Sequence, residues 1–415
     1  MHQWHKAPRY DVVAMSGRSF LQIPGPTNLP DRVLRAMDRP VIDHRSPEFA
    51  QLTEDVRVGL RRVFGTRDGA PMLYPASGTG ATEAALVNVL APGERVLSFN
   101  YGLFSGGLGM IARKFGYVVD EVPLRWGQAL APDLVEEKLR ADSSSNPYRA
   151  VLICHNETST GVTVDLAGIR QAMDAAGHDA LLIVDTVSSL ASIEFRMDDW
   201  RVDIIICGSQ KGLMLPPGLG ILGVSRRALA VAQQSGGSPR HFWDWEPIMR
   251  ENRIGLFPYT PATIMLFGLR EAVRMLVDEE GLDNVYARHR RLADGVRAAV
   301  RGWGLSTVCE DPACASNTIT AVRTPAGVDS NELLKHARER YALSLGGGIG
   351  QLNGQAFRIG HLGSLNELEV LGTIGGIELA CADLGIGIEL GSGLLAAQRA
   401  FSATAVGAPE LAAAG

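Results

Sequence analysis

The sequence predicts an α/β fold in which a mainly parallel β-sheet is flanked by helices. Short apolar runs alternate with helical periods from residues 72–74 to residues 204–207. Polar or glycine-containing loops follow these runs, as at residues 75–80, 155–161 and 208–212. Ligands of parallel sheets bind at the carboxyl ends of the strands, so we expect these loops to form the functional site.

Each predicted element rests on a local pattern. The helix over residues 47–65 carries apolar residues at three-to-four spacing and ends at a glycine. The strands are short apolar runs bounded by turn residues. We expect strands at residues 72–74, 95–99, 117–122, 150–154, 181–185, 204–207, 220–225, 318–323 and 357–360, and helices at 31–37, 47–65, 81–90, 107–115, 132–141, 166–176, 264–279, 283–301, 330–341 and 365–382.

Length and composition limit the class of protein. The chain has 415 residues, 46% of them hydrophobic, and a formal net charge of −5. This balance gives no basic excess for binding nucleic acid or an anionic membrane, and no apolar run reaches the roughly 20 residues that span a bilayer. The five cysteines lack CxxC spacing, which favours a cytoplasmic protein without disulfides or a metal site.

The chain is expected to contain two domains between less ordered ends. Residues 1–19 have no apolar core region of a signal peptide and are expected to form an extension. We expect a large domain over residues 20–285 and a smaller one over residues 286–390. Residues 391–415 are Ala-rich without strong caps, so we expect a flexible tail.

Lys211 follows a predicted buried strand and precedes a Pro-Pro-Gly turn. A lysine held in this way is costly to leave unpaired, and it can form a Schiff base with a carbonyl cofactor. Asp185 ends another strand, and the Ser77-Gly-Thr79 loop offers backbone amides and a helix N-terminus to a phosphate. Taken singly, these features are also explained by an exposed lysine, a helix cap and a capping turn.

Together these groups meet the needs of a pyridoxal phosphate (PLP) enzyme. The cofactor needs an amine for its aldehyde, a carboxylate for its ring nitrogen, amides for its phosphate and a flat partner for its ring. Phe104 follows a predicted strand and offers that flat partner. Arg358 lies on a strand of the second domain, where a guanidinium would bind a substrate carboxylate.

Seven stretches, in matching order, resemble the class V, fold-type I aminotransferases, and in particular the serine–glyoxylate and alanine–glyoxylate aminotransferase group. They cover roughly residues 20–390. The resemblance implies a seven-stranded-type sheet flanked by helices and a smaller α+β C-terminal domain. The stretches are Ile23-Pro-Gly-Pro-Thr-Asn28, Ala76-Ser-Gly-Thr-Gly80, Asn156-Glu-Thr-Ser-Thr-Gly161, Val184-Asp-Thr-Val-Ser-Ser189, Gly208-Ser-Gln-Lys-Gly212, Phe257-Pro-Tyr-Thr-Pro-Ala-Thr263 and Phe357-Arg-Ile-Gly-His-Leu-Gly363.

The resemblance also implies residue roles. Lys211 would hold PLP and move the proton between the substrate Cα and the cofactor, and Asp185 would keep the ring nitrogen protonated. Arg358 would bind the substrate α-carboxylate, unless it forms a structural salt bridge. The other cofactor-binding residues would be Ser77, Gly78, Thr79, Phe104, Thr158, Gln210, Tyr259 and Thr260, and Gly25, His44 and Arg45 would lie beside the substrate.

Three of these assignments carry alternatives or consequences. Relatives often place Trp where this chain has Phe104, which could instead belong to the core. Tyr259 and Thr260 match residues that reach the phosphate of a neighbouring subunit, which implies a homodimer with shared active sites. His44 and Arg45 resemble a pair at the substrate pocket of the serine–glyoxylate relatives, and equally fit a cap for the following helix.

The implied activity is transfer of an amino group from a small L-amino acid to glyoxylate, giving glycine and a 2-oxo acid by a ping-pong PLP mechanism. The resemblance makes serine the expected donor, with alanine or aspartate next. Thr82 stands where relatives commonly carry a large aromatic residue, and this difference leaves the choice of donor open. A lyase or desulfurase would need a reactive cysteine on a mobile loop. A silent cofactor-binding homologue would not need Lys211, Asp185 and Arg358 together. A nicotinamide dehydrogenase would need a third glycine within residues 77–83.

Overall fold

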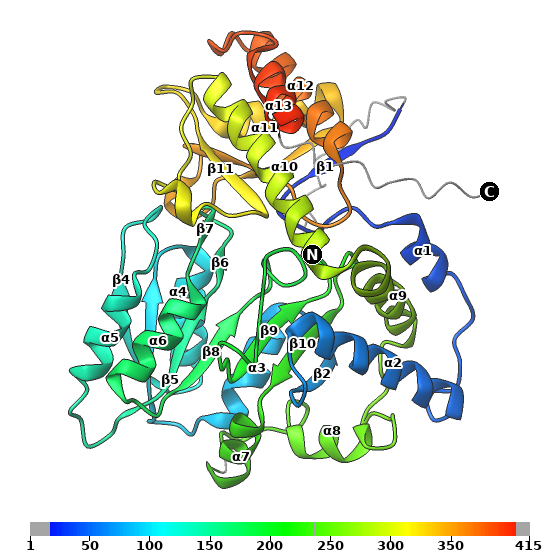
Figure 1. Cartoon of the computed structure of the whole chain (residues 1–415), viewed down its shortest axis with the longest axis vertical. Coiled ribbons are helices and arrows are strands. Elements are labelled where there is room, and N and C mark those ends of the chain that lie inside the picture. Colours follow the sequence, from blue (N-terminus) through cyan, green and yellow to red (C-terminus); the bar gives the residue numbers. More distant parts are fainter. Residues whose placement is uncertain (1–16, 236, 404–415) are drawn as a thin grey trace, which may run out of the picture.

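A seven-stranded sheet forms the centre of the larger domain in the computed structural model, which describes residues 17–235 and 237–403. The strands are β2 (Ala70–Pro75), β3 (Arg95–Asn100), β4 (Val118–Pro123), β5 (Tyr148–Cys154), β8 (Leu181–Asp185), β9 (Ile204–Gly208) and β10 (Leu219–Val224). Their order is β2-β10-β9-β8-β5-β3-β4, and helices flank the sheet (Figure 1). Only β10 pairs antiparallel to its neighbours, which confirms the mainly parallel sheet.

The helices of this domain begin and end where local chemistry stops the chain. Ser46 caps α2 by accepting a hydrogen bond from Phe49 N, and Gly65 ends that helix in the left-handed region. None of the described helices is long and apolar enough to cross a membrane. The helices are α1 (Asp31–Met37), α2 (Pro47–Phe64), α3 (Gly78–Val89), α4 (Leu103–Lys114), α5 (Pro132–Arg140), α6 (Leu166–Ala176), α7 (Arg226–Ser235), α8 (Trp245–Asn252) and α9 (Thr263–Val273), which continues as a π-helix over Arg274–Glu280.

A four-stranded sheet with its own helices forms the smaller domain. Its order is β1-β12-β13-β11, and α10 runs from the larger domain along it (Figure 1). The buried apolar side chains form one large cluster between Val33 and Val285, a second between Leu292 and Phe401, and a small third one around Val308 and Leu352. The elements are β1 (Phe20–Gln22), α10 (Leu282–Gly302), β11 (Ile319–Arg323), α11 (Ser330–Tyr341), β12 (Leu343–Gly347), β13 (Ala356–Gly360), α12 (Glu367–Asp383) and α13 (Ser392–Ala403).

Two predicted boundaries are wrong. The large domain is expected to begin at residue 20, but Phe20–Gln22 forms β1, which pairs in parallel with β12 and so belongs to the smaller sheet. The expected tail from residue 391 contains α13, whose Ala397 and Phe401 are buried against the smaller core. Residues 1–16 of the expected extension and 404–415 of the expected tail lie outside the described residues.

Candidate active site

Asp185 and Lys211 lie at the same edge of the large sheet. β8 and β9 pair in parallel with Asp185 opposite Ile206, so the carboxyl ends of the two strands meet. Lys211 follows β9 by three residues, in a loop that folds on itself. In that loop, Met214 N donates to the carbonyl of Lys211 at 2.9 Å. The parallel register therefore fixes the acid and the amine on neighbouring strand ends, as expected from sequence.

A short N-terminal segment covers Lys211. The Lys211 amine donates to the carbonyl of Pro24, and Thr27 Oγ1 donates to the carbonyl of Lys211 at 3.1 Å. Thr27 N also donates to the carbonyl of Gln210 at 3.1 Å. A Cβ on Gly25 would lie 2.4 Å from Lys211 Cδ, so only glycine permits this approach. The predicted residue Gly25 is thus in contact with the lysine side chain.

The charges at this edge change one another's pKa values. Burial, with help from Arg358, lowers the pKa of Lys211 to about 8, and Asp185 opposes that change. Burial raises the pKa of Asp185 to about 6, although Val187 N donates to its carboxylate at 2.8 Å. Lys211 therefore offers a neutral, nucleophilic amine at only slightly alkaline pH.

Arg358 reaches the site from β13 of the smaller domain. Its Nε donates to the carbonyl of Gly347 at 2.7 Å, and Nη1 donates to the carbonyl of Thr158 at 3.1 Å. Burial lowers its pKa to about 10. Within residues 17–235 and 237–403 no carboxylate lies within ion-pair distance of Arg358, so the structural salt bridge considered from sequence is not found. A half-buried guanidinium without an ion-pair partner is a site for an anion.

The N-terminus of α3 supplies a second anion site. Ser77 caps the helix by accepting a hydrogen bond from Gly80 N at 3.3 Å. The amides of Gly78 and Thr79 have no acceptor among the described residues. A Cβ on Gly78 would lie 2.7 Å from Val187 Cγ2, so glycine lets this helix end approach the loop that follows Asp185. Free amides and the helix dipole suit a phosphate.

These groups fit the cofactor implied by the resemblance. The smaller domain adds an unpaired guanidinium to an amine, a carboxylate and a phosphate site on the large sheet. Phe104 is 41% exposed at the start of α4, so the alternative of a core residue is wrong. Thr158 is buried, and its hydroxyl donates to Ser188 Oγ at 2.9 Å. Gln210 is half-buried beside Lys211.

Four residues predicted to line the site make their described contacts elsewhere within this chain. The Tyr259 hydroxyl donates to the carbonyl of Leu73 at 2.6 Å, and Thr260 is exposed. His44 and Arg45 lie in the turn before α2, where Ser46 is the cap. None of the four contacts Lys211, Asp185 or Arg358 through a hydrogen bond or ion pair in the described part of the chain. Their placement in the site stays a prediction.

Sequence reasoning missed the polar groups that hold the site together. Thr27 and Ser188 bond to the predicted residues, and the buried carboxylate of Glu157 accepts four close hydrogen bonds from α4 and from its own loop. All three residues lie within stretches that carry the resemblance. Membership of these stretches was the only signal in the sequence that could have identified the three residues, because their spacing along the chain is not distinctive.

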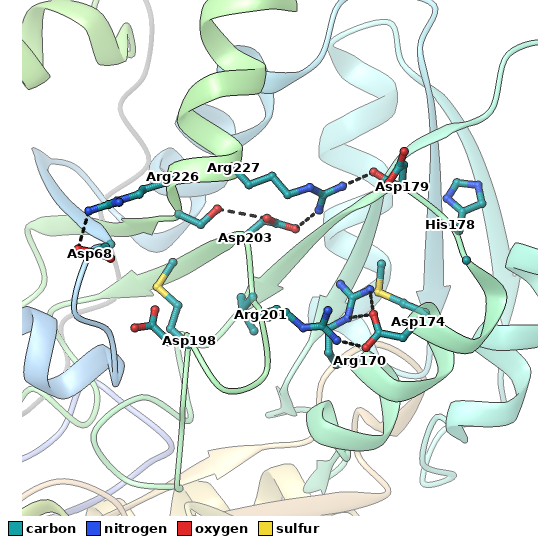
Figure 2. A pocket seen from close by; sticks show the side chains of 16 residues that line it. Asp68, Arg170, Asp174, His178, Asp179, Asp198, Arg201, Asp203, Arg226 and Arg227 are labelled. Carbon is teal, nitrogen blue, oxygen red and sulfur yellow. Dashed lines mark hydrogen bonds and ion pairs between the residues drawn. The ribbon is translucent and has the colours of Figure 1, made fainter.

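A pocket of about 900 Å³ lies at the opposite edge of the large sheet (Figure 2). Its arginines already have carboxylate partners. Arg227 donates to the buried Asp203 at 2.8 Å, and Arg170 donates to Asp174 at 2.6 Å. Paired charges at the amino ends of the parallel strands stabilise this edge, whereas the unpaired groups lie at the carboxyl ends.

Comparison with known proteins agrees with this arrangement. The family described as Aminotransferase class-V matches residues 19–348. The chain is 48% identical over 385 residues to a serine–glyoxylate aminotransferase of Methylorubrum extorquens, covering 92% of this chain and 95% of the relative. It is 43% identical over 399 residues to an L-aspartate–glyoxylate aminotransferase of Paracoccus denitrificans, covering 96% and 100%. The ureidoglycine–glyoxylate aminotransferase structure from Bacillus subtilis superposes with a TM-score of 0.86 at 29% identity, covering 94% and 99%.

Proposed function

The chain belongs to the class-V aminotransferases, and from this membership we propose that it transfers the amino group of serine to glyoxylate. Members of this family depend on PLP, and this chain is a PLP-dependent transaminase. The observation that carries the proposal is the half-buried Arg358, which has no ion-pair partner among the described residues and whose charge helps to lower the pKa of Lys211. Both an α-amino acid and glyoxylate bring the carboxylate that this guanidinium lacks.

Each group of the site would have its own role in the reaction. When bound, PLP supplies an aldehyde that receives the amino group and a ring that accepts electrons from the substrate. Lys211 would hold the aldehyde and take the proton from the substrate Cα, and Asp185 would hold the proton on the ring nitrogen. Arg358 would orient the α-carboxylate. The amides of Gly78 and Thr79 would bind the phosphate.

The identity of the amino donor is a separate part of the proposal. Serine is supported by the names of three relatives, from Methylorubrum extorquens, Hyphomicrobium methylovorum and Arabidopsis thaliana, at 43–48% identity. Aspartate is the second candidate, because one relative at 43% identity is an L-aspartate–glyoxylate aminotransferase. Thr82 does not favour a polar donor directly. Its side chain is buried, and its hydroxyl donates to the carbonyl of Gly78 at 3.1 Å.

We further propose a homodimer with shared active sites. Apolar side chains are exposed near the site, at Leu103 (43%) and Phe104 (41%), and also at Phe242 (39%) and Ile254 (63%). Sedimentation should give twice the subunit mass. Mixing Lys211→Ala subunits with Thr260→Ala subunits should restore activity that neither has alone, because one hybrid site keeps both groups. Lack of restoration in a confirmed hybrid dimer would exclude sharing.

We also propose that the protein works in the cytoplasm. All five cysteines are free thiols, and four of them are buried. This state suits a reducing compartment. Fractionation of the source cells, followed by detection of the protein in the soluble cytoplasmic fraction, would test the location.

Half-reactions test the activity and the donor together. The purified PLP-loaded protein is mixed with serine, alanine or aspartate, and the loss of the coenzyme absorbance near its visible maximum is followed. Serine should bleach the band fastest, and glyoxylate should restore it. Faster bleaching by aspartate would move the assignment to the second donor. A band that no amino acid bleaches would exclude transamination.

A further inference from the structure

A buried glutamate holds the first turn of α4. Glu157 is 0% exposed, and one of its carboxylate oxygens accepts hydrogen bonds from Ser105 N at 2.7 Å and from Phe104 N at 3.1 Å. The other oxygen accepts from Ser159 N at 3.0 Å and from Ser159 Oγ at 2.6 Å. Ser159 Oγ in turn accepts from Leu103 N at 3.1 Å. Three successive amides of α4 are therefore bound by one short loop.

This cap comes from outside the helix. The residue that precedes α4 is Gly102, which has no side chain to cap with. A Cβ on Gly102 would lie 2.3 Å from the Glu157 side chain, so glycine leaves room for the carboxylate. Among the described residues no cation pairs with Glu157, and its charge is held by amides, a hydroxyl and the positive end of the helix dipole.

The same loop also contacts the other parts of the site. Thr158, between Glu157 and Ser159, accepts the hydrogen bond from Arg358 at 3.1 Å. The charge of Glu157 also raises the pKa values of both Asp185 and Arg358, so it lies near both groups. Phe104, at the other end of the cap, is exposed, and its backbone amide donates to Glu157.

We propose that Glu157 is a positioning residue that fixes the first turn of α4, and with it Phe104, against the face of the bound cofactor ring. The inference rests on the proposed function, because it requires PLP beside Lys211. A carboxylate is needed because all of its close partners are donors. The amide of a glutamine would turn a donor toward at least one of them.

The chain supplies a matched control. Glu378 of the smaller domain is also buried, and it also binds the start of a twelve-residue helix, through Gly393 N at 2.9 Å and Leu394 N at 3.1 Å. It accepts a further bond from Trp303 Nε1 at 3.0 Å. Glu378→Gln therefore removes a similar cap at a place remote from the cofactor residues.

Three measurements on Glu157→Gln and Glu378→Gln test the proposal. In the cofactor-free protein, hydrogen exchange of amides 104 and 105 should become faster in Glu157→Gln only. With PLP, Glu157→Gln should bind the cofactor about tenfold or more weakly, the equivalent of ~1.4 kcal/mol, and should change the visible circular dichroism of the bound coenzyme. Glu378→Gln should lower the melting temperature without changing either cofactor signal.

The outcomes separate the two proposals. Wild-type affinity and dichroism in Glu157→Gln, with only a lower melting temperature, would reduce Glu157 to a structural cap and overturn the inference. A wild-type protein that forms no coenzyme band would overturn the proposed function as well. If Glu157→Gln does not fold, Ser159→Ala takes its place. Ser159→Ala removes one donor to Glu157 and should shift the same signals in the same direction by less.

Discussion

The carboxylate of Asp185 lies close enough to the amine of Lys211 to raise the pKa of that amine, although burial brings it down to about 8. Asp185 ends β8, and Lys211 follows the neighbouring parallel strand β9 by three residues, so strand pairing brings the two groups to the same sheet edge. A cofactor bound to both would be held at two points of one rigid sheet edge.

Attachment of PLP to the cofactor-free protein should accelerate as pH rises through about 8. The neutral amine is the nucleophile, and a pKa below the usual value of 10.5 makes that form available earlier. Stopped-flow absorbance across a pH series measures the midpoint. Asp185→Asn should move the midpoint lower, because the carboxylate that raises the lysine pKa is gone. A wild-type midpoint near the ordinary lysine value of 10.5 would contradict the lowered pKa of Lys211.

Asp185→Asn should lower kcat by roughly 10²-fold or more while leaving the fold intact. The amide oxygen can still accept the hydrogen bond from Val187 N, but it cannot hold a proton on the ring nitrogen. The variant also removes a carboxyl group whose charged form is disfavoured by burial, so thermal unfolding should occur at the same or a higher temperature. A kcat close to wild type would show that the ring nitrogen does not depend on this residue.

Arg358→Gln should reduce kcat/KM for the amino acid and for glyoxylate alike, by roughly 10- to 100-fold. Both substrates carry a carboxylate, and the unpaired guanidinium is the group that would bind it. Arg226→Gln is the control, because Arg226 lines the pocket of Figure 2 and pairs with Asp68 at the surface. That control should keep wild-type kinetics, and a loss there would point to the other pocket.

Gly25→Ala should impair the attachment of PLP far more than it impairs folding. Gly25 has φ +99° and a Cβ there would collide with Lys211, so the lysine side chain must move. Gly93→Ala is matched, since Gly93 has φ +87° but nothing within 4 Å of the added carbon. Both variants carry a similar backbone cost of about 1 kcal/mol. Only Gly25→Ala should lose coenzyme absorbance at a given PLP concentration.

The large sheet could be predicted because most of its strands are short apolar runs whose burial needs no knowledge of a partner; β4, with Asp120 and Glu121, is the exception. The pairing of β1 with β12 could not, because Phe20–Gln22 and Leu343–Gly347 are distant in sequence. α13 was missed for a related reason. Its sequence carries no strong cap of its own. The cap comes from Glu378 of α12, and Phe401 packs against Gly295 of α10. Tertiary contact, not local propensity, decides both elements.

The residues of the candidate site also separate into those that the sequence predicts and those that only the fold reveals. Lys211 and Asp185 could be predicted because strand ends leave a clear sequence pattern. Glu157 could not, because a glutamate in a polar loop is usually solvated, and its partners are backbone amides of another segment. That Arg358 forms no ion pair among the described residues could be established only from the fold, because the sequence does not show which carboxylates come within ion-pair distance of it.

The N-terminal strand divides its attachments between the two domains. Phe20–Gln22 is fastened to the smaller sheet, whereas Thr27 is bonded to the backbone of Gln210 and Lys211 in the larger one. Any hinge rotation between the domains must therefore also move residues 23–26, of which Pro24 and Gly25 contact the lysine side chain. Closure of the two lobes around a substrate and the freedom of the reactive amine are mechanically linked through these four residues.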